Sequence, residues 1–192
     1  KFGVYDDLQP VLANALGSQE TTLFKMVAAY AMFANGGERV EPTLVDRVQD
    51  RYGKTVYRPD ERVCDDCNDL NLPLGQAPRV ISNRERVMNE ITAYQLTSML
   101  EGVGSGARTV NLPVPVAGKT GTTNSAKDVW FVGFSSNIVA GCYIGYDNPK
   151  SLGSGAFGGS MCGPVFNQFM GEAIKKYGGG PFNVPADCQF IP

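Results

Sequence analysis

Three stretches of the sequence carry apolar residues at the three- and four-residue spacing of an amphipathic helix. Thr21 or Thr22 can cap the start of the first stretch, and Gly36-Gly37 after it favours a stop. Gly104-Ser105-Gly106 follows the second stretch, and we expect it to break that helix. The third has Pro164 in its first turn and lysines at its end. The pattern therefore predicts helices over residues 21–35, 90–103 and 164–177.

Extended segments separated by turn residues predict antiparallel strands in the rest of the chain. Residues 39–58 alternate around a turn at residues 50–53, which favours a hairpin. Three later strands form an antiparallel meander, whose last two strands are joined by a turn at Ser135-Ser136-Asn137. These strands are predicted over residues 114–122, 129–134 and 138–146. Irregular structure is expected over residues 59–84, 151–159 and 178–192.

The order of the predicted elements is helix, hairpin insertion, helix, sheet and closing helix. This order predicts an α+β fold, in which an antiparallel sheet is flanked by helices.

The charge and the start of the chain limit the classes of partner. A formal net charge of −2 over 192 residues argues against nucleic acid and anionic membrane surfaces. No run approaches the ~18 consecutive apolar residues of a transmembrane helix. The chain begins at Lys1 without a methionine or a leader, so we expect it to be the interior of a longer protein.

The sequence contains no histidine. Ser-His-Asp and Cys-His catalysis are therefore excluded within this chain, as are histidine-containing metal sites. Any proton transfer near neutral pH would have to use a carboxylate, a lysine, a tyrosine or a cysteine.

Cys64 and Cys67 form a CxxC motif in an acidic loop. A redox motif would be expected between a strand and a helix, and acidic neighbours should raise the thiol pKa rather than lower it. A zinc site would need two more ligands, and the other cysteines are not paired by spacing. We expect either a local disulfide, compatible with an oxidising compartment, or ordinary loop cysteines.

The segment VAGKTGTTN, residues 116–124, places Lys119 at the end of a predicted strand. Gly121 removes a side chain that would block a ligand approaching the strand edge. Thr120 and Thr122 are two residues apart, so their hydroxyls face one side of the strand. An exposed edge strand can bind an extended peptide by strand addition. A polar strand end with a solvated lysine explains the pattern equally well.

Three other short motifs favour structural interpretations. Residues 153–158 match GxGxxG, but the strands before them are predicted to be antiparallel, so we expect a surface loop and not a dinucleotide site. Residues 135–137 fit S-x-N and are expected to form a hairpin turn. Thr22 lies three residues before Lys25, where we expect a helix cap and a solvated lysine.

Long segments around these motifs resemble the transpeptidase domain of class A penicillin-binding proteins. The resemblance covers roughly residues 12–175 and is carried by four segments. They are ETTLFKMVAAYAMFANGGERVEPTLVDRVQDRYGKTVY, ITAYQLTSMLEGV, GKTGTTNSAKDVWFVGFSSNIVAGCYIGYDNPKSLG and GGSMCGPVFNQFM. It implies a penicillin-binding-protein/β-lactamase-like transpeptidase fold, of which residues 1–177 would be the C-terminal part. The hairpin and loop excursion at residues 38–89 would lie within that part, and residues 178–192 would be an irregular tail.

The family's catalytic motifs are S-x-x-K, S-x-N and K-T-G, in that order along the chain. No serine here stands three residues before a lysine, so we expect the nucleophile and its lysine base to precede Lys1 in a parent protein. The resemblance gives Lys119 a catalytic role beside the substrate carboxylate and implies no metal and no cofactor. The residues that it assigns to substrate binding are Thr120, Gly121, Thr122 and Thr123. Asp128 and Trp130 are expected to fix the strand turn and the core.

The resemblance implies that the parent is a serine-type D-alanyl-D-alanine transpeptidase. It would cross-link peptidoglycan stem peptides through an acyl-enzyme and would be acylated by β-lactams. Class A members also carry a glycosyltransferase domain and a membrane anchor, so the parent is expected on the periplasmic face of the cytoplasmic membrane. A D,D-carboxypeptidase, a serine β-lactamase and a non-catalytic peptide- or partner-binding module remain alternatives.

The family usually has a longer turn after the helix at residues 90–103. The shorter turn here leads us to hypothesise that a few residues are missing between Val103 and Gly106.

Overall fold

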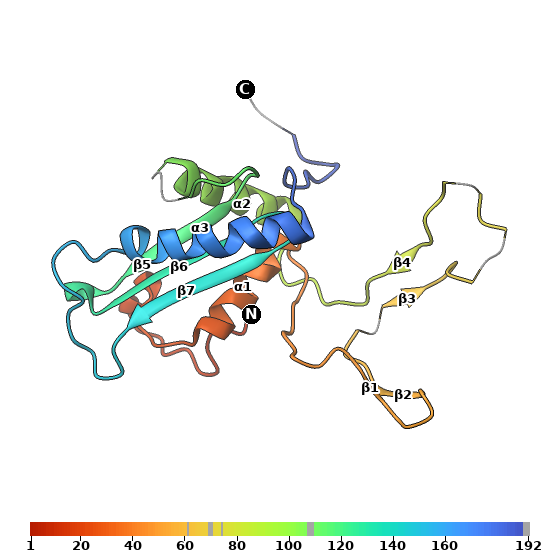
Figure 1. Cartoon of the computed structure of the whole chain (residues 1–192), viewed down its shortest axis with the longest axis horizontal. Coiled ribbons are helices and arrows are strands. Elements are labelled where there is room, and N and C mark those ends of the chain that lie inside the picture. The colour runs from red at the N-terminus through yellow and green to blue at the C-terminus, as the bar shows by residue number, and fades with distance from the viewer. Residues whose placement is uncertain (61, 69–70, 74, 107–109, 190–192) are drawn as a thin grey trace. The chain divides into compact units, whose positions relative to one another are not determined.

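A computed structural model describes residues 1–60, 62–68, 71–73, 75–106 and 110–189 (Figure 1). The chain divides into two compact units, the first comprising residues 1–40 and 86–192 and the second comprising residues 41–85. Within the described ranges, no helix is long and apolar enough to cross a membrane.

The first unit is built on a three-stranded antiparallel sheet with the strand order β5-β6-β7 (Figure 1). The strands are β5 (Ala117–Thr122), β6 (Asp128–Phe134) and β7 (Val139–Gly145). The predicted meander is therefore confirmed. The first strand begins three residues later than predicted because Pro113 and Pro115 cannot donate backbone hydrogen bonds to a ladder.

Helices cover both faces of this sheet (Figure 1). Helix α3 (Gly158–Tyr177) lies on the face of Phe131, whose ring meets the ring of Phe166 edge-on at a centroid distance of 4.6 Å. Helix α1 (Leu23–Ala34) lies on the opposite face. There a Cβ at Gly141 would lie 2.6 Å from Val27 Cγ2 and 2.8 Å from Leu23 Cδ1, so a larger residue would require these side chains of α1 to shift. The core between α3 and the sheet is formed by Val116, Val129, Phe131, Cys142, Cys162, Phe166, Met170 and Ile174.

Helix α1 begins and ends as predicted. Thr22 is its N-cap, and its Oγ1 accepts a hydrogen bond of 3.2 Å from the N–H of Lys25. Gly36 and Gly37 follow the helix with φ values of 67° and 90°, in the left-handed region that favours glycine.

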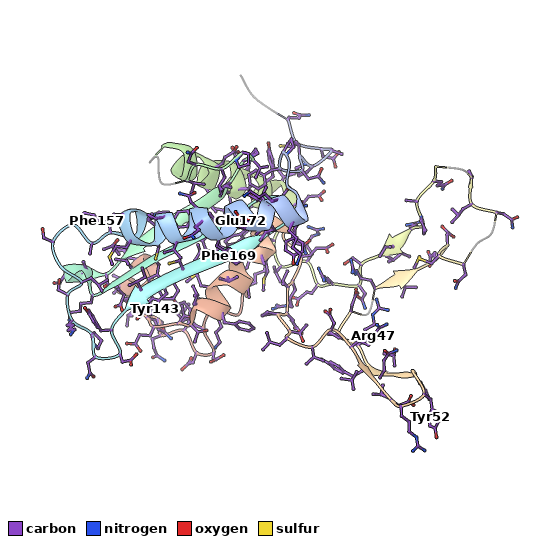
Figure 2. The ribbon with its side chains drawn as sticks, in the orientation of Figure 1. Arg47, Tyr52, Tyr143, Phe157, Phe169 and Glu172 are labelled. Carbon is purple, nitrogen blue, oxygen red and sulfur yellow. A yellow bond between two sulfur atoms is a disulfide. The ribbon has the colours of Figure 1, made fainter. Side chains whose placement is uncertain are left out.

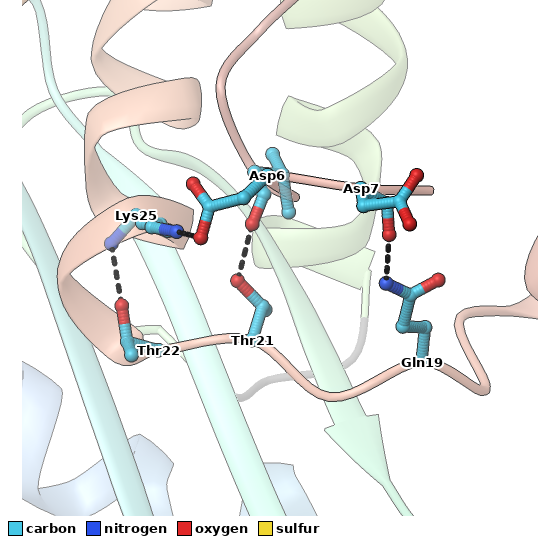
Figure 3. A network of polar contacts seen from close by, with 7 residues as sticks. Asp6, Asp7, Gln19, Thr21, Thr22 and Lys25 are labelled. Atoms are coloured by element: carbon cyan, nitrogen blue, oxygen red, sulfur yellow. Dashed lines mark hydrogen bonds and ion pairs between the residues drawn. The ribbon is translucent and has the colours of Figure 1, made fainter. Parts of the chain in front are cut away.

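A polar network holds the N-terminal segment beside the start of α1 (Figure 3). Lys25 Nζ pairs with Asp6 Oδ2 at 2.6 Å, and the Thr21 hydroxyl donates to the Val4 carbonyl at 2.6 Å. Gln19 Nε2 donates to the carbonyl of Asp7 at 2.7 Å. A short 3-10 helix, η1 (Leu12–Leu16), lies between these contacts along the chain and was not predicted.

Helix α2 (Glu90–Gly106) packs against α1 and β5. The predicted break at residues 104–106 is wrong, because the helix continues to Gly106. Glycine costs a helix only ~1 kcal/mol per residue, which lowers its stability without ending it. Nothing tests the hypothesis that a few residues are missing between Val103 and Gly106, so it stays a prediction.

Helix α3 begins at Gly158 and not near Pro164, so the predicted loop over residues 151–159 is shorter than expected. Pro164 lies inside the helix, where it cannot donate a hydrogen bond to the carbonyl of Ser160. The side chains of Cys162 and Phe166 on either side are 0% and 2% exposed. Their burial offsets the missing hydrogen bond, and this tertiary contribution is not visible in local propensity.

The second unit contains two small antiparallel hairpins. The predicted hairpin is formed by β1 (Val48–Gln49) and β2 (Thr55–Tyr57), with exposed Tyr52 in its turn (Figure 2). The strand pair β3 (Val63–Cys64) and β4 (Val80–Ile81) was not predicted, because two-residue strands are too short to show an alternating pattern.

Two local contacts lie beside β3 in the second unit. Cys64 and Cys67 form a disulfide with a Cα–Cα distance of 5.5 Å, which confirms the local-disulfide alternative. Asp60 accepts hydrogen bonds from Arg62, including one of 2.8 Å from its Nε, and these hold the pKa of the Asp60 carboxyl well below its ordinary value.

Candidate functional site

The K-T-G segment, residues 119–121, lies within β5, which is at an edge of the sheet. In the part of the chain that the structure describes, no further strand pairs with it. The Thr123 N–H donates to the Asp128 carbonyl at 3.0 Å and continues the β5–β6 ladder. Alternation along that ladder directs the backbone groups of Gly121 to β6 and those of Thr120 and Thr122 away from it. These outward groups can pair with an extended ligand.

The side chains of β5 face two different sides of the sheet, as the spacing predicted. Lys119 is paired with Val132, and Val132 with Gly141, so the lysine lies on the α1 face. Its side chain is exposed, and Nζ donates to the carbonyl of Thr120 at 2.9 Å.

The structure gives a reason for glycine at position 121 that the sequence did not reveal. It is on the same face as Lys119, where a Cβ would lie 3.2 Å from the Cβ of Trp130. The missing side chain at Gly121 therefore makes room for Trp130. The predicted role of Gly121 in leaving the strand edge open to a ligand stays a prediction.

Thr120 and Thr122 lie on the α3 face, where their strand partners are Phe131 and Val129. Thr120 is half-buried and Thr122 is exposed. The Thr122 Oγ1 accepts a hydrogen bond of 3.1 Å from the backbone N–H of Gly158, the first residue of α3. The sequence could not predict this contact, because the two residues are 36 positions apart.

Thr123 closes the turn between β5 and β6. Its Oγ1 accepts a hydrogen bond of 2.8 Å from the Asp128 N–H, so its hydroxyl is engaged within the turn. The Tyr143 hydroxyl donates to Asp128 Oδ1 at 2.8 Å, and this hydrogen bond to the carboxylate raises the pKa of Tyr143. The ring of Trp130 lies against that of Tyr143, with centroids 5.0 Å apart. Asp128 and Trp130 thus hold the turn and its neighbouring strands, as expected.

The same turn contains two residues that sequence reasoning missed. Ser125 and Ala126 have φ values of 63° and 47°, in a region that costs a non-glycine residue ~1–2 kcal/mol. The carbonyl of Ala126 accepts a hydrogen bond of 2.8 Å from the N–H of Leu152. The strained turn is therefore hydrogen-bonded to the loop that leads into α3.

The start of α3 fits closely against the β5–β6 ladder. A Cβ at Gly158 would collide with the carbonyl oxygen of Trp130 and would lie 2.8 Å from that of Gly121. Gly158 is the last glycine of the GxGxxG match. The strand before that loop, β7, runs antiparallel to β6, unlike the parallel unit of a dinucleotide fold.

The S-x-N match lies at the other end of the sheet from Thr122. The Ser135 Oγ accepts hydrogen bonds of 3.4 Å and 3.3 Å from the N–H groups of Asn137 and Ile138. Asn137 Nδ2 donates to the carbonyl of Tyr177 at 3.1 Å. These contacts confirm the interpretation of residues 135–137 as a turn.

Cys142 and Cys162 are free thiols buried in the core between the sheet and α3. Burial, followed by a hydrogen bond with Cys142, raises the pKa of Cys162 to about 12. The Cys162 thiol therefore stays protonated near neutral pH and is a poor nucleophile. Over the residues that the structure describes, no group of three or more acidic or cysteine side chains is placed to hold a metal ion.

Comparisons with known proteins agree with this geometry. The family model described as "Penicillin binding protein transpeptidase domain" matches residues 8–171. The chain is 43% identical to penicillin-binding protein 1A of Rickettsia typhi over 100% of its own length, and 36% identical to penicillin-binding protein 1A of Neisseria gonorrhoeae over 93%. It spans 25% and 21% of the lengths of these two relatives.

A solved structure shows the same fold. The crystal structure of penicillin-binding protein 1A from Haemophilus influenzae matches 96% of this chain with a TM-score of 0.73 and 28% identity. The match covers 31% of that protein's chain. The fold, the K-T-G strand and the family match agree, and the chain belongs to the penicillin-binding protein transpeptidase domain family.

Proposed function

We propose that this chain is the part of a serine-type D-alanyl-D-alanine transpeptidase that binds the end of the stem peptide. The observation that carries this proposal is the exposed edge of β5, where Thr120 and Thr122 direct backbone groups outward. Relatives named penicillin-binding protein 1A support it, and they do not favour a D,D-carboxypeptidase or a non-catalytic binding module.

The edge can bind the substrate along its length. The stem peptide lies beside β5 as an additional strand and pairs with the outward backbone groups. Its terminal carboxylate accepts hydrogen bonds from the hydroxyls of Thr120 and Thr122, and the ammonium of Lys119 supplies positive charge nearby. The backbone N–H of Thr122 donates to the scissile carbonyl oxygen. Such a donor typically lowers the barrier by ~3 kcal/mol as negative charge develops on that oxygen.

The bond-making group is a serine from a part of the protein that precedes this chain. Its oxygen attacks the carbonyl of the penultimate D-alanine, the terminal D-alanine leaves, and an ester links the peptide to the enzyme. An amine of a neighbouring stem peptide then attacks the ester and regenerates the serine. A β-lactam is attacked in the same way, and its ring opening leaves a stable ester. No histidine is needed, because a lysine beside the serine serves as base.

The whole protein is proposed to be membrane-anchored, with this domain on the periplasmic side of the cytoplasmic membrane and a glycosyltransferase domain elsewhere in its chain. The disulfide between Cys64 and Cys67 supports an oxidising compartment, because such bonds are rare in a reducing cytosol.

The proposal is tested by following D-alanine release and cross-linked product from stem-peptide substrates with the longer protein that carries the serine. Lys119→Ala should lower kcat/KM by ~10²-fold or more, as expected for a group that stabilises charge at the reaction centre. Lys54→Ala is the matched control, because Lys54 is exposed in the turn of the β1–β2 hairpin, and it should leave the rate unchanged. Equal rates for wild type and Lys119→Ala would contradict the proposed function.

A further inference from the structure

We propose that the backbone N–H of Gly158 is a positioning group, which orients the Thr122 hydroxyl so that its proton points at the substrate carboxylate. This inference rests on the proposed function and adds a part of the site that lies outside the K-T-G segment. It also explains why α3 begins with a glycine at this close approach.

The hydrogen bond between the two residues limits the directions in which the Thr122 proton can point. A hydroxyl carries one proton and two acceptor lone pairs. The Gly158 N–H occupies one lone pair of Oγ1 at 3.1 Å, and this is the one partner of Oγ1 among the described residues. Since Thr122 is exposed, its O–H can donate to a ligand on the open side of the strand. An ionised carboxylate accepts hydrogen bonds and donates none, so it matches this arrangement.

The start of α3 suits this task for two reasons. The first N–H groups of a helix have no acceptor within the helix, so Gly158 has a donor to offer. The helix is 20 residues long, and its N-terminal end carries partial positive charge that favours an anion nearby. A side chain at Gly158 would prevent the contact, because its Cβ would collide with the carbonyl oxygen of Trp130.

Ser160 holds the first turn of α3 in place. Its Oγ accepts a hydrogen bond of 3.1 Å from the Phe157 N–H and lies 3.1 Å from the carbonyl of Gly155. Ser160 does not touch Thr122 in the described contacts, so its removal loosens Gly158 without changing the K-T-G strand.

The experiment compares two probes on the longer protein that carries the serine. Benzylpenicillin presents a carboxylate, and its methyl ester presents a neutral group of similar shape. One variant replaces Gly158 by glycolic acid through nonsense suppression, which exchanges the N–H for an oxygen and adds no bulk. A second variant is Ser160→Ala. Gly171→Ala is the control within the same helix, where the nearest atom to a new Cβ lies at an ordinary 3.8 Å.

We expect both variants at the start of α3 to acylate ~3–10-fold more slowly with benzylpenicillin, the effect of one misaligned hydrogen bond to a charged group. Acylation by the methyl ester should change less than twofold, and Gly171→Ala should match wild type with both probes. A rate that is unchanged with both probes, or that falls equally with both, would overturn the inference.

A Thr122→Val variant separates this inference from the proposed function. If it slows benzylpenicillin selectively while the Gly158 ester variant does not, only the positioning role is wrong. If wild type forms no adduct with benzylpenicillin, or Thr122→Val slows neither probe, the proposed site itself is wrong and the inference falls with it.

Discussion

Replacing Gly158 with alanine should change the free energy of unfolding through two effects of opposite sign. Alanine is favoured over glycine within a helix by up to ~1 kcal/mol, so helix propensity alone predicts a more stable protein. The packing of α3 against β5 and β6 predicts the reverse. The sign of the measured change therefore tells which of the two effects dominates.

The structure gives the size of the steric effect. The new Cβ would collide with the carbonyl oxygen of Trp130 and lie 2.8 Å from that of Gly121, where ordinary contacts begin at 3.4 Å. Both oxygens belong to the backbone of the sheet and cannot rotate away, so the helix start must move by more than half an ångström. Overpacking of this kind costs ~1–3 kcal/mol, and the lost hydrogen bond to Thr122 adds ~1 kcal/mol. We expect a net loss of ~1–3 kcal/mol after the gain in propensity.

The assay is urea unfolding followed by the fluorescence of Trp130, the single tryptophan of the sequence. Gly171→Ala in the same helix is the control, because its new Cβ would meet only Leu112 Cδ2 at 3.8 Å. That variant should unfold at an equal or higher urea concentration, because its free energy of unfolding should rise by up to ~1 kcal/mol. If Gly158→Ala were as stable as Gly171→Ala, the close approach of α3 to the ladder would be refuted.

Three further results are expected. Phe131→Ala should lower the free energy of unfolding by ~3–5 kcal/mol in a urea titration, since the ring is fully buried against Phe166; a loss below ~1 kcal/mol would contradict that packing. The hydrogen bond to Asp128 raises the pKa of Tyr143 in the folded protein. Its contribution to the free energy of unfolding is therefore present below pH ~10 and is lost as the pH rises through the folded pKa of Tyr143. Tyr143→Phe should therefore flatten the fall in stability above that pH, and an unchanged slope would argue against the hydrogen bond. The Cys162 thiol should resist alkylation at pH 8 until the protein is unfolded, as read by peptide mass spectrometry, because burial raises its pKa to about 12; rapid labelling of the folded protein would contradict its burial.

Much of the fold could be predicted because its elements have strong local patterns. Helix α1 combines helical periodicity with a capping threonine and a Gly-Gly stop, and each of these signals lies within a few residues of the element it defines. The meander has long apolar strands with a short polar turn between the last two, so its register follows from adjacency in sequence.

The start of α3 could not be predicted, because its reasons are tertiary. Gly158 and Pro164 disfavour a helix locally. The contacts that offset this are the hydrogen bond from Gly158 to Thr122 and the burial of Cys162 and Phe166 against the sheet, and both depend on strands far away in sequence. The alternation of side chains predicted which residues share a face of β5. The hydrogen-bond partner of Thr122, however, depends on where α3 begins. The missed part of the candidate site is therefore the part that requires the packed structure.

The most direct test of the account is the intact mass of the longer protein after incubation with benzylpenicillin, followed by peptide mapping of any adduct. The account predicts one drug mass per protein, attached to a serine that precedes Lys1 and is followed three residues later by a lysine. Lys119→Ala should slow the formation of that adduct. An adduct on a residue within these 192 positions, or no adduct on a folded protein, would contradict the claim that β5 presents substrate to a serine supplied from elsewhere in the domain.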